Sequence, residues 1–136
     1  MKSQKGITLI ALVITIIVLL ILAGVTIAML TGENGILTKA TGATDATGQA
    51  EAKEAVQLAL STILANKNDP TYIGSQNTIT GANLVAIMQQ DNSSATVKST
   101  DVTEGKDKGC INITYKASSN AKEYTVTVDS STGKIK

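Results

Sequence analysis

The chain begins with a long run of apolar residues that contains no charge. No charged side chain occurs between Gly6 and Gly32, and sixteen of the 24 residues from Ile7 to Leu30 are Leu, Ile or Val. As a helix this run is about 36 Å long, enough to cross a hydrocarbon core of about 30 Å. Its apolar side chains contribute on the order of −5 to −10 kcal/mol to membrane insertion. We therefore predict a membrane-spanning helix over residues 7–31.

Positive charge precedes this span in the short polar segment MKSQKG. Lys2 and Lys5 lie there, so the positive-inside rule places the N-terminus in the cytoplasm and exports residues 32–136. A secretory signal peptide has a shorter apolar region of about 7 to 15 residues. The small residues between Ala23 and Ala28 leave ordinary signal-peptidase cleavage as a minor alternative.

Two kinds of helical sequence follow the span. Residues 32–48 contain four glycines, each of which costs about 1 kcal/mol in a helix, so this segment is predicted to be the soft part of a long helix. From Gln49 to Lys67 apolar residues recur at spacings of three and four, which predicts an amphipathic helix that ends before Pro70. Its apolar face comprises Ala52, Ala55, Val56, Ala59, Leu60, Ile63 and Leu64.

Alternating apolar positions replace helical spacing near the C-terminus. They predict one strand through Ile111, Ile113 and Tyr115, and a second through Tyr124, Val126 and Val128. Further elements are predicted as a strand over 95–99, a short edge strand over 133–135 and a short helix over 82–90. The predicted fold class is α+β, with a long hydrophobic and then amphipathic N-terminal helix packed on a small antiparallel sheet.

Composition excludes several kinds of chemistry. The chain has twelve lysines, eleven acidic residues, no arginine and no histidine, for a formal charge of +1. Such a balance gives no strong nucleic-acid signal. Cys110 is the only cysteine, so no intramolecular disulfide forms, and we expect a buried small side chain there. We expect neither an enzyme nor a cofactor.

The acidic stretch near residue 104 is a candidate calcium-binding loop by composition alone. Asp101, Glu104 and Asp107 lack the ligand spacing of known calcium motifs and alternate with Lys106 and Lys108. A solvated loop is the better interpretation, and no metal site is predicted.

The junction of the polar segment and the span, K-G-I-T-L-I from Lys5 to Ile10, resembles the processing motif of type IV pilins. In that family a prepilin peptidase cuts after a glycine and methylates the new terminal amine. The resemblance implies cleavage after Gly6 and methylation of Ile7. It also implies a leader of residues 1–6, a filament-core helix over 7–31, a glycine-rich helical segment over 32–48 and an extracellular domain over 49–136.

The resemblance further implies that the hydrophobic helix packs against copies of itself in a filament. The residues expected to take part are Thr8, Leu9, Ala11, Leu12, Ile16, Leu20 and Gly24. Ala11 departs from the family, which usually has at this position a glutamate that pairs with the terminal amine of a neighbouring subunit. Either the lineage builds filaments without that carboxylate, which we favour, or this is a tip or minor subunit. The Thr8 hydroxyl and backbone carbonyl groups are candidates to solvate the amine.

The expected function is that of a structural subunit, a major pilin, of an extracellular filament used for adhesion or motility. The expected partners are copies of the chain, the membrane, prepilin peptidase and the pilus assembly machinery. Before assembly the chain would be a single-pass membrane protein, and afterwards part of a cell-surface filament. Two alternatives stay open: a pseudopilin of a secretion or DNA-uptake system, and an uncleaved, membrane-anchored binding protein.

Overall fold

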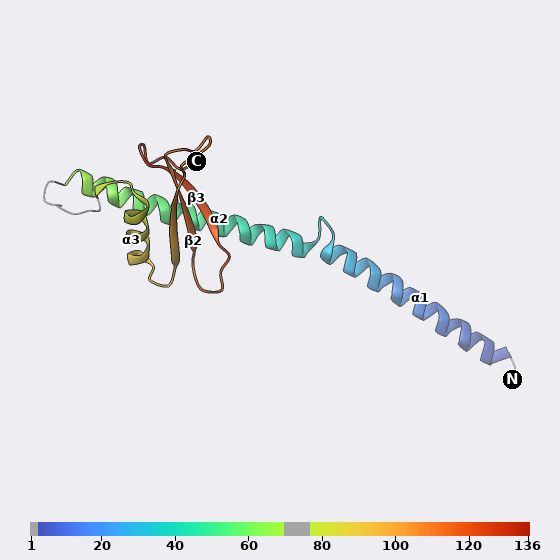
Figure 1. Cartoon of the computed structure of the whole chain (residues 1–136). Coiled ribbons are helices and arrows are strands. Elements are labelled where there is room, and N and C mark those ends of the chain that lie inside the picture. Colours follow the sequence, from blue (N-terminus) through green and yellow to red (C-terminus); the bar gives the residue numbers. More distant parts are fainter. Residues whose placement is uncertain (1–2, 70–76) are drawn as a thin grey trace. The chain divides into compact units, whose positions relative to one another are not determined.

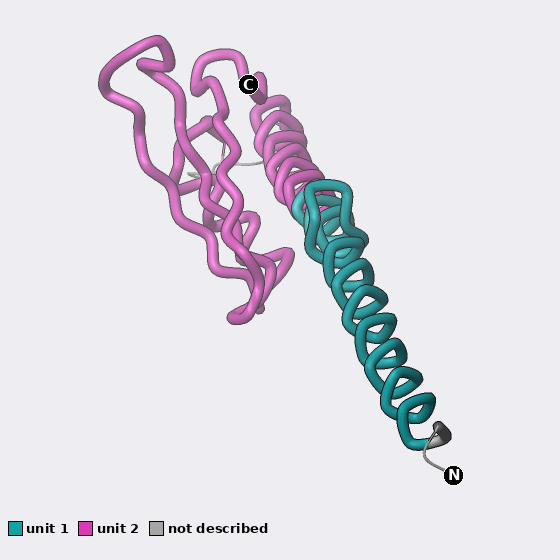
Figure 2. The backbone as a smooth tube through the Cα atoms, turned by 90° about the vertical axis from the view of Figure 1, so that its right-hand side faces the viewer, with its two compact units in different colours: residues 1–45 teal, residues 46–136 magenta. Residues whose placement is uncertain are grey.

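In the computed structural model, which describes residues 3–69 and 77–136, helices come first along the chain and strands last (Figure 1). The elements in order are α1 (Ser3–Thr31), α2 (Ile36–Lys67), α3 (Gly81–Asp91), β1 (Thr96–Asp101), β2 (Cys110–Lys116) and β3 (Tyr124–Asp129). The chain forms two compact units, residues 1–45 and 46–136, coloured separately in Figure 2. The fold is α+β, as predicted.

The C-terminal part of α2 packs on one face of the sheet and supplies five of the fifteen residues in the core cluster of the folded unit. Its fully buried residues include Ala52, Val56, Ala59 and Ile63. The two alanines bring little bulk to this contact. Leu64, which the sequence placed on the same face, is 45% exposed. That assignment was wrong, because Leu64 lies at the edge of the buried face of α2 and its side chain is exposed to solvent.

Three antiparallel strands form the sheet in the order β1-β2-β3. β2 is central, and its register pairs Ile113 with Ser99 on one side and with Val126 on the other. Alternation along β2 and β3 divides the sheet into an apolar face that meets the helices and a more polar face. The buried strand residues of the core are Val97, Ile111, Ile113, Tyr115, Val126 and Val128.

The short helix α3 closes the core beside β1. Thr80 caps its N-terminus, and the Thr80 hydroxyl accepts a hydrogen bond from the backbone N–H of Asn83 at 3.3 Å. Leu84 and Met88 from this helix are buried in the core. A Cβ atom on Gly81 would lie 2.5 Å from the Ser99 hydroxyl oxygen, so glycine allows the helix to begin close to β1.

A buried tyrosine joins the central strand to both neighbouring helices. The Tyr115 hydroxyl donates to Glu51 Oε1 on α2 at 3.3 Å and accepts from Asn92 Nδ2, at the end of α3, at 3.5 Å. Burial raises the pKa of Tyr115, and the nearby Glu51 charge raises it further. The hydroxyl therefore stays protonated and retains its hydrogen-bond donor at physiological pH.

Several smaller predictions can be compared directly with these elements. The strand predicted over 95–99 is present as β1, and the helix predicted over 82–90 as α3. Cys110 is buried and free, as expected. The edge strand predicted over 133–135 is reduced to an isolated antiparallel bridge between Ile135 and Val128. Hydrogen bonds from the Asp129 N–H to the Lys134 carbonyl oxygen and from the Lys136 N–H to the Thr127 carbonyl oxygen flank this bridge. Pro70 lies outside the described residues.

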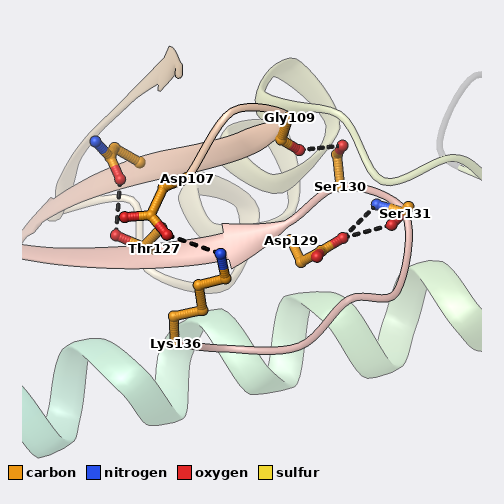
Figure 3. A network of polar contacts seen from close by, with 8 residues as sticks. Asp107, Gly109, Thr127, Asp129, Ser130, Ser131 and Lys136 are labelled. Atoms are coloured by element: carbon orange, nitrogen blue, oxygen red, sulfur yellow. Dashed lines mark hydrogen bonds and ion pairs between the residues drawn. The ribbon is translucent and has the colours of Figure 1, made fainter. Parts of the chain in front are cut away.

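A polar network holds the turn after β3 (Figure 3). The Asp129 carboxylate accepts hydrogen bonds from the Ser131 hydroxyl at 2.6 Å, the Ser131 N–H at 2.9 Å and the Thr132 N–H at 3.1 Å. These bonds lower the pKa of Asp129 to about 2. Beside the turn, Lys136 Nζ contacts Asp107 Oδ1 at 2.7 Å. The C-terminal residues are thus tied back to the sheet.

The glycine at position 48 accommodates an aromatic ring. A Cβ atom built on Gly48 would lie 2.4 Å from carbon atoms of the Tyr124 ring, whereas one built on Gly42 meets nothing within 4 Å. Both residues lie inside α2. Gly48 therefore permits the packing of Tyr124 against the helix, while Gly42 has no such role within the chain.

We expect Gly48→Ala to destabilise the folded unit by roughly 1–3 kcal/mol in thermal unfolding of the detergent-solubilised protein, because the ring must leave the helix. In a Tyr124→Ala background the same change should instead stabilise by about 0.5–1 kcal/mol through helix propensity. Gly42→Ala is the matched control and should not lower stability. Equal effects of Gly48→Ala in both backgrounds would contradict the packing role.

We expect the turn after β3 to make stability depend on pH in the acid range. Because the folded pKa of Asp129 is lowered to about 2 from 3.8, its contribution is fully present above about pH 4 and is lost as pH falls towards 2. Asp129→Asn should remove this part of the acid dependence of the unfolding temperature. Glu123→Gln, outside the network, serves as control, and an unchanged acid profile in Asp129→Asn would contradict the assignment.

Candidate functional site

The residues expected to be processed lie inside a helix. Since α1 begins at Ser3, Gly6 and Ile7 both have helical backbone, and the Ile7 side chain is 67% exposed. A Cβ atom built on Gly6 would meet nothing within 4 Å. Glycine costs about 0.5–1 kcal/mol relative to alanine inside a helix. The described fold therefore gives no packing reason for glycine at position 6.

The residues expected to assemble lie along α1 with their side chains uncovered. Leu9, Leu12, Ile16 and Leu20 follow one another at spacings of three and four and share a face of the helix. All four are between 49% and 67% exposed. Gly24 continues the row, and a Cβ atom there would meet nothing within 4 Å. By length and composition this helical stretch is able to cross a membrane.

Small residues beside this row leave a shallow hollow around Ala11. The hollow has a volume of about 520 Å³, and Thr8, Leu9, Ala11 and Leu12 line it together with Lys5 and Thr15. Thus four of the expected residues are brought together at one place. Thr15 was missed, although its spacing of seven from Thr8 and four from Ala11 places all three on one side of the helix.

Threonine hydroxyl groups in α1 are satisfied within the helix. The Thr15 hydroxyl donates to the Leu12 carbonyl oxygen at 2.7 Å, the Thr31 hydroxyl donates to the Ile27 carbonyl oxygen at 2.9 Å, and Thr26 donates to Leu22 in the same way. Such bonds leave no unpaired hydroxyl donor in an apolar environment. These threonines are therefore compatible with either lipid or a protein core around them.

The helix is interrupted at Gly32–Gly35, where the apolar run ends. A Cβ atom on Gly32 would lie 2.7 Å from the Ala28 carbonyl oxygen, and one on Gly35 would lie 2.6 Å from that of Leu30. Because both neighbours are backbone atoms, no side-chain movement relieves the overlap. The Gly35 N–H donates to the Gly32 carbonyl oxygen at 2.7 Å, and α2 restarts at Ile36 and continues through Gly42 and Gly48.

An open hollow of about 550 Å³ lies at this interruption. Its apolar lining includes Val25, Ala28 and Met29, and its polar lining includes Glu33 and Asn34. No hydrogen bond or ion pair joins the exposed Glu33 carboxylate to any residue that the structure describes. Sequence reasoning missed this place as a site, although the first acidic residue after a charge-free span marks it.

Other chemistry has little basis in the described residues. Within residues 3–69 and 77–136, no group of three or more Cys, Asp or Glu side chains lies close enough to hold a metal ion. Asp107, in the acidic loop near residue 104, pairs with Lys136. Candidate function is therefore concentrated in α1 and in the interruption that follows it.

Comparisons of the chain with models of protein families, with curated proteins and with solved structures find no match. The long apolar N-terminal helix followed by a small antiparallel sheet is the element content expected of a pilin-like chain. Function has to be argued from the site itself.

We expect the double variant Gly32→Ala/Gly35→Ala to convert the interruption into continuous helix, because Cβ atoms exclude the broken backbone and alanine favours helix. Hydrogen exchange measured by mass spectrometry in detergent should then slow by roughly tenfold or more at residues 33–35. Gly24→Ala, where a Cβ meets open space, should leave this exchange unchanged. Unaltered exchange in the double variant would show that the glycines do not maintain the interruption.

Proposed function

We propose that this chain is the structural subunit of an extracellular filament, resembling a major type IV pilin, which assembles through α1. The observation that carries the proposal is the exposure of the apolar side chains of α1 along its entire length. A separate α+β unit contains its own buried core and has no need of these side chains.

The exposed apolar surface requires a covering. Burying a Val, Leu or Ile side chain contributes about 1.5–3 kcal/mol, and sixteen such residues lie between Ile7 and Leu30. In a membrane, lipid covers them. Outside the membrane, copies of the same helix are the covering that the chain itself provides, and repeated packing around an axis yields a helical filament.

The glycine at position 6 supports processing at the Gly6–Ile7 bond. It has no packing role within the described fold and costs helix stability, so a different requirement explains it. Recognition by a prepilin peptidase is such a requirement, and the neighbouring Lys5 and Thr8 match the family's pattern. Cleavage removes two lysines with the leader and leaves ten lysines against eleven acidic residues, a net charge of −1.

Location and partners follow from this proposal. The chain is held in the cell membrane by one span before assembly, is cut by the peptidase and is then drawn into the filament by assembly machinery. Its α+β unit lies outside the cell in both states, and its surface makes the contacts on which adhesion or motility depends.

An intact-mass measurement on native protein tests the proposal. We expect loss of residues 1–6 and one added methyl group on Ile7, with the mature chain as the main component of filaments sheared from cells. Gly6→Val should remain full length in the membrane and give no filaments, because a branched side chain at the cut site blocks the peptidase.

Gly42→Ala is the matched control and should be processed and assembled normally, since a Cβ there meets open space. A wild-type chain that keeps its first six residues overturns the proposal in favour of a membrane-anchored protein. Processing without surface filaments would instead indicate a pseudopilin.

A further inference from the structure

We propose that the interruption after α1 is a binding site for the N-terminus of a second copy of this chain, with Glu33 pairing to the Ile7 amine. The inference rests on the proposed function, since cleavage after Gly6 creates that amine. It specifies a contact between subunits that involves only the first of the two compact units.

The amine needs a carboxylate, and the chain offers few. An α-amino group is positively charged at neutral pH, and burying it unpaired among apolar side chains is costly. Neutral hydroxyl and carbonyl groups solvate such a charge but do not compensate it. Glu33 is the only acidic residue within the first 44 residues, and it follows directly on the charge-free run.

The end of α1 adds further negative potential beside Glu33. A helix C-terminus carries the equivalent of about half a negative charge on its last carbonyl groups. Among the described residues, Gly32 N–H donates to Ala28, but no backbone N–H beyond the helix end donates to the carbonyl oxygens of Met29, Leu30 or Thr31. These oxygens and the unpaired carboxylate together favour a cation at this place.

The hollow has one apolar and one polar wall, which match the two parts of an N-terminal isoleucine. Val25, Ala28 and Met29 provide an apolar wall for the Ile7 side chain, and Glu33 and Asn34 provide a polar wall for its amine. An acidic peptide would be repelled by Glu33, and an inorganic cation would leave the apolar wall uncovered. A terminal amine attached to an apolar residue matches both walls.

This contact arranges the apolar helices end to end. Each α1 is about 36 Å long from Ile7 to Thr31, at about 1.5 Å per residue. When the first residue of one copy meets the interruption of another, apolar surface continues from helix to helix and the helix dipoles align head to tail.

The test measures processing and filament yield from cells that produce the full chain. Glu33→Gln should be cleaved and methylated normally yet yield at least roughly tenfold fewer sheared filaments, because removing one partner of a buried ion pair is strongly unfavourable. Glu54→Gln, an exposed carboxylate on α2, should assemble as the wild type does.

A second-site change distinguishes pairing from a merely structural effect. Ala11 lies four residues after Ile7, one turn along the helix, so Glu33→Gln/Ala11→Glu places a carboxylate beside the amine and should restore yield to within about twofold of the wild type. Glu33→Gln/Ala11→Gln should not restore it.

Two results overturn the pairing while leaving the proposed function intact. One is a processed Glu33→Gln chain that assembles like the wild type, which would mean that the amine enters the filament uncharged or is solvated by neutral groups. The other is a loss of filaments that Ala11→Glu does not rescue. A wild-type chain that is never cleaved overturns both the pairing and the proposed function.

Discussion

The need to cover an apolar helix governs the rest of this structure. From Lys5 to Thr31, where burial is described, no side chain of α1 is buried by the chain itself, and the 24 residues from Ile7 to Leu30 contain no charge. Such a helix is stable only in lipid or against other apolar surfaces. Polar groups inside it must be satisfied locally, and the threonine hydroxyls meet this condition by donating to carbonyl oxygens one turn earlier.

The core of the folded unit is built with few large side chains. The chain has no Phe or Trp and only three tyrosines. Aliphatic residues of α2, α3 and the strands form the core, and two of the α2 residues in it are alanines. Polar contacts supplement this core at two places, through Tyr115 between the helices and through Asp129 in the turn after β3. A unit of this size buries proportionately little surface, so such contacts carry more weight than in a larger domain.

Glycines separate and adapt the helices in this chain in distinct ways. At Gly32 and Gly35, nearby backbone carbonyl oxygens leave no space for a Cβ atom. At Gly48, the lack of a Cβ atom makes room for the Tyr124 ring, and the helix continues without a break. Gly6 and Gly24 have open space around them within the chain. Under the proposed function, Gly6 is recognised by the peptidase and Gly24 faces neighbouring helices.

The amino-acid sequence alone determined the elements whose signal is local. The long apolar helix, the amphipathic face of α2, the alternation in β2 and β3 and the α+β class follow from periodicity and charge, because hydrophobic spacing directly reflects which side of an element is buried. Tertiary structure decided what depends on contacts between distant residues. Leu64 proved exposed because the sheet covers only a limited arc of α2, and Ile135 pairs with Val128 in an isolated bridge. Likewise, the difference between Gly42 and Gly48 arises from Tyr124, far along the chain, and the hollow beside Glu33 forms where the helix is interrupted.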